Sequence, residues 1–349
     1  MALQAAGNFM DIKSGFFSHI YVERRVSDHP ATLKILEHFP MAKTVYINHY
    51  KDIFNRRHQN FCVQKQAPAL ILAKKEGQLV YPGPPVCQSF GNHYFYYTSC
   101  IMNCIYDCEY CYLQGMYPSG NVVLFVNLED IFAEVDNLLL KHPVYLCVSY
   151  DTDLLALEGI AGFVRRWYDF ASLRPKLTIE IRTKSGAFKR LEKLAPVPNV
   201  IFAWTLSPQS IIEKYEHYTA PLDIRIRQLR QAAAAGFLVR ICFDPLIYIE
   251  NFKEVYGALV KQVFSEPVHI MDASIGVFRV SVDYLKQIRR HRPGSRLLWY
   301  PFVSEQGVYH YGHELSEKMT ETVKGFLLDY MEDERLFVWN GEDNDGTRM

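Results

Sequence analysis

The stretch YYTSCIMNCIYDCEYCYLQG, residues 96–115, holds four of the eight cysteines of the chain. They are Cys100, Cys104, Cys108 and Cys111, separated by three, three and two residues. In a reducing compartment, clustered cysteines indicate metal or redox chemistry more often than disulfide bonds. The fold and the function therefore depend on what this stretch binds and on the elements around it.

The composition is that of a globular protein. The chain has 349 residues, 49% of them hydrophobic, and can bury a large core in one large or two modest domains. Its 38 basic and 38 acidic side chains balance, so any polyanion site has to be a local patch. We find no N-terminal targeting signal and no apolar run of the roughly 18 to 20 residues that cross a bilayer. We therefore expect a cytoplasmic protein with no membrane partner.

Six short apolar runs alternate with helical stretches in residues 84–280 and predict the parallel strands of an α/β fold. The runs read HYFYYTS, PVYLCVSY, KLTIEIRTK, NVIFAWTLS, FLVRICFDPLIYI and VHIMDASIGVFRV. A partial (β/α)6 barrel fits this order best, entered through a proline- and glycine-rich linker, YPGPPVCQSFGN. Residues 1–83 predict a small N-terminal α/β layer. Residues 281–349 predict an extension with a basic helix, a strand at SRLLWYPFV, a turn around Gly307, a further helix and a disordered polar tail.

Two simpler explanations of the cysteine cluster compete with redox chemistry. A four-thiolate zinc site usually pairs two CxxC knuckles far apart in sequence, and this run offers only one. Buried structural thiols describe Cys62, Cys147 and Cys242, which stand in apolar surroundings. They do not describe four cysteines crowded into a polar loop.

The C-x3-C-x2-C spacing of Cys104, Cys108 and Cys111 resembles the signature of radical S-adenosylmethionine (SAM) enzymes. The resemblance implies that three thiolates hold a [4Fe–4S] cluster whose fourth iron stays open for SAM. Cys100 cannot replace any of the three, because a set beginning there would need a cysteine at Asp107. The loop directly follows the first predicted strand, so we expect its ligands at the C-terminal end of the barrel.

The segment CEYCYLQ, together with VSYDTD, IRTKS and TLSP, is similar to the spore photoproduct lyase family. This resemblance implies a SAM-derived 5′-deoxyadenosyl radical that converts 5-thyminyl-5,6-dihydrothymine in ultraviolet-damaged DNA back to two thymines. An electron donor of the ferredoxin or flavodoxin type is implied as well. The resemblance places Tyr110 and Tyr112 beside SAM and in a hydrogen-transfer relay. It also places polar SAM contacts at Thr152, Lys184 and Thr205, although the family has serines in place of the two threonines.

One departure from the family concerns the hydrogen donor. The well-studied branch has a cysteine on the second barrel strand that returns a hydrogen atom to the product, and the matching position here is Tyr150. We expect Cys87, in the loop before the cluster, to be the donor, with Tyr150 as the second candidate. An ordinary loop cysteine and an ordinary strand-end tyrosine are the structural alternatives.

DNA contact is expected in the C-terminal extension. The segment LKQIRRHRPGSR is a local basic patch in which Arg289, Arg290 and Arg292 are candidates for phosphate contact. A hairpin at SEQGVYHYGHE would present Tyr309 and Tyr311 to bases. A solvated helix face and core tyrosines explain the same residues without DNA.

The preferred interpretation is a radical SAM carbon–carbon lyase that repairs DNA. The alternatives are a radical SAM enzyme of the same scaffold with another substrate, and a zinc-bound nucleic-acid-binding module without catalysis.

Overall fold

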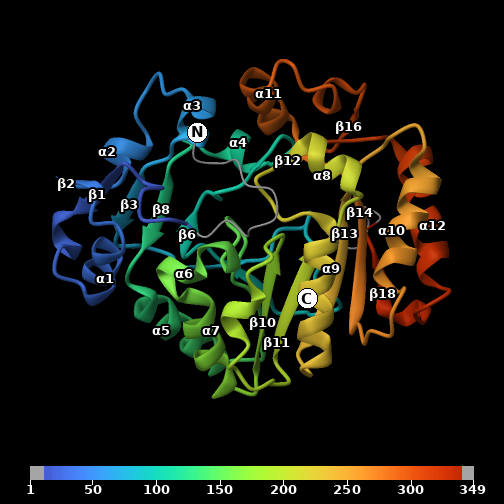
Figure 1. Cartoon of the computed structure of the whole chain (residues 1–349), viewed down its shortest axis with the longest axis horizontal. Helices are drawn as coiled ribbons and strands as arrows, with labels where there is room; N and C mark the ends of the chain where they lie inside the picture. The colour runs from blue at the N-terminus through green and yellow to red at the C-terminus, as the bar shows by residue number, and fades with distance from the viewer. Residues whose placement is uncertain (1–11, 340–349) are drawn as a thin grey trace.

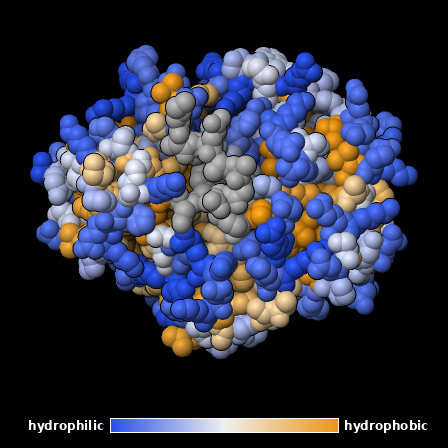
Figure 2. All heavy atoms as spheres, in the orientation of Figure 1, coloured by the Kyte–Doolittle hydropathy of each residue, from blue (hydrophilic) through white to orange (hydrophobic). Residues whose placement is uncertain are grey.

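The computed structural model describes residues 12–339. Two sheets with parallel strands stand next to one another, with helices packed on them, and one apolar core extends through both (Figure 1). Figure 2 shows hydrophilic residues over most of the face seen there, with hydrophobic residues in small scattered groups. In the described part of the chain, no helix is both long enough and apolar enough to span a bilayer.

The larger sheet contains the six expected parallel strands. They are β5 (Phe95–Thr98), β9 (Val144–Cys147), β10 (Leu177–Thr183), β11 (Val200–Thr205), β13 (Leu238–Leu246) and β14 (Asp272–Val277). Each pairs in parallel with the next in this order. The sheet does not close, because β4 (Val80–Pro82) lies antiparallel beside β5 and β18 (Leu336–Val338) lies parallel beside β14. The expected six-stranded partial barrel is confirmed, with one extra strand at each edge.

Helices connect the barrel strands and cover the sheet. They are α5 (Leu128–Leu139), α6 (Glu158–Ala161), α7 (Phe163–Ser172), α8 (Gln209–Tyr215), α9 (Leu222–Ala234), α10 (Phe252–Val263) and α12 (His313–Leu327). Strands β9, β11 and β14 are buried along their whole length, which explains their almost continuous apolar sequence. Because the six strands are parallel, their carboxyl ends all lie at one end of the sheet.

The N-terminal α/β layer is a five-stranded sheet in the order β2-β1-β3-β8-β6. Its strands are β1 (His19–Glu23), β2 (Lys43–Ile47), β3 (Leu70–Ala73), β6 (Ile101–Met102) and β8 (Val122–Phe125), and its helices are α1 (Pro30–His38), α2 (Lys51–Phe54) and α3 (Phe61–Gln66). Two of these strands come from beyond residue 83, on either side of the cysteine motif. The domain boundaries at residues 83 and 280 stay predictions, and this sheet joins the first two regions.

The C-terminal extension begins with β15 (Val280–Ser281) and the basic helix α11 (Val282–His291). The expected turn at Gly307 is present, because Gln306 and Gly307 both have positive φ and join β16 (Val303–Glu305) to β17 (Val308–His310). The expected strand at SRLLWYPFV is reduced to β16 and preceded by a 3-10 turn, Leu297–Trp299. The expected polar tail falls on residues 340–349, which lie outside the described residues.

Helix α11 packs directly on α4 (Leu113–Met116), the short helix that follows the last cysteine of the motif. The contact passes through Gly115, where an added Cβ would lie 2.4 Å from Cβ and 2.5 Å from Cα of Tyr284. A glycine is therefore required for the backbones of the two helices to approach this closely.

Replacing this glycine should destabilise the fold. We expect Gly115→Ala to lower the free energy of unfolding by about 1–3 kcal/mol, because the new methyl group overpacks a contact with backbone. Urea denaturation followed by circular dichroism measures the change. The matched control is Gly325→Ala in α12, where nothing lies within 4 Å of the added Cβ and alanine should be neutral or slightly stabilising. Equal stabilities for Gly115→Ala and the parent would contradict the close packing.

Candidate active site

A cavity of about 510 Å³ lies at the carboxyl ends of the six parallel strands. Each strand, or the loop that follows it, contributes lining residues, among them Tyr97, Tyr150, Thr152, Lys184, Thr205, Asp244 and Phe278. The cysteine motif forms one side of the same cavity. The structure thus brings the six strand ends and the cysteine motif to one place.

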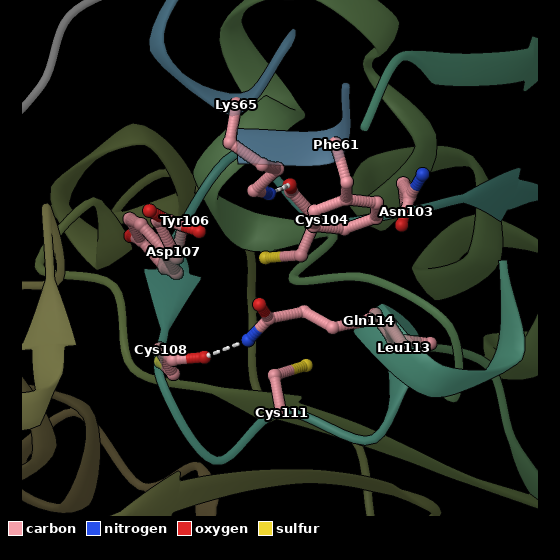
Figure 3. Close-up of a pocket in the computed structure, with 10 residues that line it drawn as sticks. All are labelled: Phe61, Lys65, Asn103, Cys104, Tyr106, Asp107, Cys108, Cys111, Leu113 and Gln114. Atoms are coloured by element: carbon pink, nitrogen blue, oxygen red, sulfur yellow. Dashed lines mark hydrogen bonds between the residues drawn. The ribbon is translucent and has the colours of Figure 1, made fainter. Parts of the chain in front are cut away.

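The three motif cysteines also line a smaller recess next to the large cavity. Figure 3 shows the sulfur atoms of Cys104 and Cys111 in the recess, with Cys108 at its left in this view and Cys111 the lowest of the three. Asn103 fixes the start of the loop, since it has a φ of 67° and its amide donates to the carbonyls of Ser119 and Asn121 at 2.6 and 2.8 Å. Such a loop holds three thiols around a shared space.

These thiols are costly to ionise in the absence of a bound cation. Burial raises the pKa of Cys104 and of Cys108 to about 12, and that of Cys111 to about 11. Neighbouring cysteines add to these increases, while Lys65 and Lys184 oppose them. Three adjacent buried thiols fit a positively charged iron–sulfur core, which binds the thiolate form. Within residues 12–339, no three His, Cys, Asp or Glu side chains are grouped to hold a single metal ion.

Glu216 connects the cysteine loop to the barrel. It lies in β12 (Glu216–His217), which pairs antiparallel with β7 (Asp107–Cys108), so that Glu216 stands opposite Cys108. Its carboxylate accepts from Arg225 at 2.6 Å and from Lys184 at 3.1 Å. Tyr110 and Ser207 also donate to it. Sequence reasoning missed this residue, because a lone glutamate at a helix end carries no motif.

Lys184 is held beside both the motif and the cavity. Its ammonium donates to the hydroxyl of Tyr110 at 2.6 Å and lies 3.8 Å from Sγ of Cys108. Burial alone would lower the pKa of Lys184, but Cys108 and Glu216 raise it above its ordinary value. For Glu216, burial would raise the pKa, but Arg225 and Lys184 lower it well below its usual range. Both groups are therefore charged at neutral pH.

Thr152 and Thr205 place hydroxyl groups at the same cavity. The hydroxyl of Thr152 is buried and has no hydrogen-bond partner among the residues that the structure describes. A buried hydroxyl without a partner is unfavourable by about 1–3 kcal/mol, and at the cavity this hydroxyl is available to a polar group of a ligand. Thr205 ends β11, and its carbonyl accepts from Arg225 at 3.0 Å.

Tyr112, Tyr150 and Cys87 form a continuous chain along the cavity wall. The hydroxyl of Tyr112 donates to the carbonyl of Tyr150 at 2.6 Å, and the thiol of Cys87 lies 3.9 Å from the hydroxyl of Tyr150. The loop that carries Cys87 is attached to the barrel by Arg279, whose guanidinium donates to the carbonyl of Val86 at 2.8 and 3.0 Å. The two candidate hydrogen donors thus lie in contact.

The basic residues expected to contact DNA divide into two groups. Arg292 forms an ion pair with Asp107, and Arg289 donates to the carbonyl of Leu298 at 2.8 Å. Both guanidinium groups are therefore engaged in contacts within the protein. Arg290 is exposed, as are Lys286 and Arg296 nearby. The basic surface of α11 therefore centres on Arg290.

The two hairpin tyrosines occupy different environments. Tyr311 is buried, its ring contacts those of Tyr300 and Phe302, and its hydroxyl accepts from the backbone of Tyr248. Tyr309, on β17, is half-buried. Tyr311 thus has the environment of a core residue.

The remaining cysteines lie outside the two cavities, except Cys147. Cys100 is buried, with Sγ 3.8 Å from the carbonyl of Val148, and it lines neither cavity. Cys242 is also buried, and Cys62 contacts the carbonyl of His291. Cys147 is buried in β9 and lines the large cavity.

Comparison with known proteins connects this geometry with one family. The family model described as spore photoproduct lyase matches residues 95–290. The spore photoproduct lyase of Clostridium acetobutylicum is 23% identical over 173 residues, 48% of this chain and 51% of the relative. That of Bacillus subtilis is 22% identical over 164 residues, 46% and 48% of the two chains. The matches thus span about half the length of these curated relatives.

Solved structures share the fold over almost the whole chain. A spore photoproduct lyase complexed with dinucleoside spore photoproduct superimposes with a TM-score of 0.79 at 16% identity, covering 92% of this chain and 98% of the other. A mutant lyase with bound AdoMet and dinucleoside spore photoproduct gives 0.78 at 17% identity, with the same coverage. The partial barrel and its two extensions are therefore the fold of these proteins.

Removing the charge of Glu216 should destabilise the protein strongly. We expect Glu216→Gln to lower the free energy of unfolding by about 3–5 kcal/mol at pH 7, because two buried cations lose their shared anion. Because folding lowers the pKa of Glu216, its contribution is present above about pH 4.3, the ordinary value, and is lost as the pH falls below it. The difference between parent and variant should therefore shrink in acid.

Chemical denaturation at pH 7 and at pH 3 measures both effects. Glu317→Gln, at an exposed site in α12, is the control and should change stability by no more than about 0.5 kcal/mol. A variant with parental stability at pH 7, or a difference that grows in acid, would contradict the assignment.

Proposed function

The chain belongs to the spore photoproduct lyase family, and we propose that it repairs 5-thyminyl-5,6-dihydrothymine in DNA by radical SAM chemistry. The observation that carries the proposal is the convergence of Cys104, Cys108 and Cys111 with Lys184 and Thr152 at one cavity. A thiol set, a buried cation and an unpartnered hydroxyl at the mouth of an α/β barrel suit a bound metal group and a charged cofactor.

Cys104, Cys108 and Cys111 would hold a [4Fe–4S] cluster. When bound, the cluster and SAM supply reductive cleavage that yields a 5′-deoxyadenosyl radical. An electron carrier of the ferredoxin or flavodoxin type would provide the electron. The buried pair of Glu216 and Arg225 keeps the loop at the end of the barrel.

Lys184, Thr152 and Thr205 would bind the polar groups of SAM. The ammonium of Lys184 would bind the carboxylate by a charge-assisted hydrogen bond of roughly 1.5–3 kcal/mol. The hydroxyl of Thr152 would gain the partner that it lacks. Tyr110 orients Lys184 through its hydroxyl, and Tyr112 lies where a relay to Tyr150 would begin.

Cys87 would return the last hydrogen atom to the thymine radical of the product. Burial raises the pKa of Cys87, although Arg279 and Arg182 oppose this, so the sulfur keeps its hydrogen at neutral pH. Tyr150 lies between Cys87 and Tyr112 and would carry the hydrogen onward or serve as donor itself.

Ultraviolet-damaged DNA would approach over α11. The lesion must leave the base stack to reach the cavity, at a cost of a few kcal/mol that is smaller for a damaged site. Arg290, with Lys286 and Arg296, would contact phosphates, while Arg289 and Arg292 act inside the protein. Tyr309 would be the hairpin residue nearer to the bases, because Tyr311 is buried.

The proposed activity requires three of the four clustered cysteines. We expect the reconstituted protein to bind about four irons and to convert dinucleoside spore photoproduct to two thymidines with SAM and dithionite. Cys104→Ala, Cys108→Ala and Cys111→Ala should each lose the iron and the product, whereas Cys100→Ala should keep both. Iron analysis and chromatography of the products measure the outcome. Cluster loss in Cys100→Ala with retention in Cys104→Ala would refute the ligand assignment, and a colourless protein with tightly bound zinc would refute the enzyme.

Cys87 should control how the reaction ends. We expect Cys87→Ala to cleave SAM and consume the lesion, but to release less thymine and more adducts or uncoupled 5′-deoxyadenosine, because the product radical lacks its donor. Tyr150→Phe should have a milder effect. Chromatography of a single turnover separates these products. If Cys87→Ala released thymine as cleanly as the parent and Tyr150→Phe did not, the final hydrogen donor would be Tyr150 and not Cys87.

A further inference from the structure

Lys65 is a buried cation next to the three motif cysteines. Its side chain lines the small recess with Cys104, Cys108 and Cys111, and its ammonium donates to the carbonyl of Cys104 (Figure 3). Only 6% of Lys65 is exposed. It comes from α3, outside the residues that the family model matches.

Among residues 12–339, the recess gives this ammonium no carboxylate partner. Of the described residues that line it, Asp107 is the one with an acidic side chain, and Arg292 pairs with it. Within residues 12–339, no ion pair joins Lys65 to an aspartate or glutamate. A single neutral carbonyl compensates poorly for moving an ammonium out of water, so an anion close by would stabilise this buried lysine.

The other cations that the structure describes near the cysteines already have carboxylate partners. Lys184 and Arg225 share the carboxylate of Glu216, and Arg292 pairs with Asp107. Among the described residues, Lys65 is therefore the cation at the recess whose charge is left for the group that the three thiolates bind.

Helix α3 is docked closely enough to keep Lys65 in place. A Cβ added at Gly120 would lie 2.8 Å from the carbonyl of Phe61 and 3.1 Å from the backbone nitrogen of Lys65. The backbone N–H of Gly120 donates to the side chain of Gln64 at 2.8 Å. The turn before β8 thus holds the lysine against the cysteine loop.

We propose that Lys65 is the counter-charge of the iron–sulfur cluster and favours its one-electron reduction. The inference rests on the proposed function. Three thiolates and a [4Fe–4S]²⁺ core together carry one negative charge, and an electron from an external donor makes it two. A fixed cation stabilises the second state more than the first. Removing the charge should lower the ratio of reduced to oxidised cluster about tenfold at a fixed potential, equivalent to about 59 mV for one electron.

A redox titration of the reconstituted protein, followed by electron paramagnetic resonance, tests the proposal. Lys65→Arg keeps the charge and should stay close to the parent. Lys65→Gln keeps a donor for the Cys104 carbonyl without charge, and Lys65→Met keeps neither. In both variants the ratio of reduced to oxidised cluster at a fixed potential should be about tenfold lower than in the parent. Lys75→Met is the matched control. Lys75 is also buried and donates to a carbonyl, that of Ser99 at 2.8 Å, but it lines neither cavity.

The outcomes separate charge from anchoring and from failure of the enzyme. Parental potentials in Lys65→Met and Lys65→Gln, with iron bound, would overturn the counter-charge. A parental potential in Lys65→Gln together with a shifted potential in Lys65→Met would also overturn it, because the effect would then come from the hydrogen bond to the Cys104 carbonyl. Iron loss in both neutral variants with retention in Lys65→Arg supports the proposal, and loss in all three overturns it. A parent that binds no cluster would instead refute the proposed function.

Discussion

The burial of one carboxylate, that of Glu216, constrains the active end of this protein. Its two oxygens accept from Lys184, Arg225, Tyr110 and Ser207, which come from four different parts of the chain. An unpaired charge at this depth would be strongly unfavourable, so all of these groups must assemble together. Because Glu216 also stands opposite Cys108 in a two-stranded pairing, the assembly fixes the cysteine loop relative to the barrel.

Much of the architecture follows from local sequence patterns. Strands such as Leu177–Thr183 and Val200–Thr205 were predictable because they are buried, short and flanked by helices, so their apolar runs stand out. The five-stranded N-terminal sheet was harder to predict. Its edge strand Ile101–Met102 has only two residues and lies directly before the cysteine motif, and strand pairing over long sequence distances leaves no periodic signal.

Those residues of the candidate site that belong to a local sequence motif were predictable. Those that tertiary contacts bring to the site were not. The spacing of Cys104, Cys108 and Cys111 is a local property, and the structure places all three at one cavity. Lys65 and Glu216 were not found, because each acts through a partner far away in the sequence. The charge run that includes Arg289 and Arg292 is local, but sequence alone does not distinguish an arginine that faces solvent from one that pairs with Asp107.

The contact of Gly115 with Tyr284 has a mechanical consequence. Side chains in a helix interface can change rotamer and absorb a displacement, whereas two backbones in direct contact cannot. The contact therefore leaves helices α4 and α11 little freedom to shift against each other, with Arg290 on one helix and the residues that follow Cys111 on the other. The position of the outer surface of α11 is thereby tied to the position of the cysteine loop.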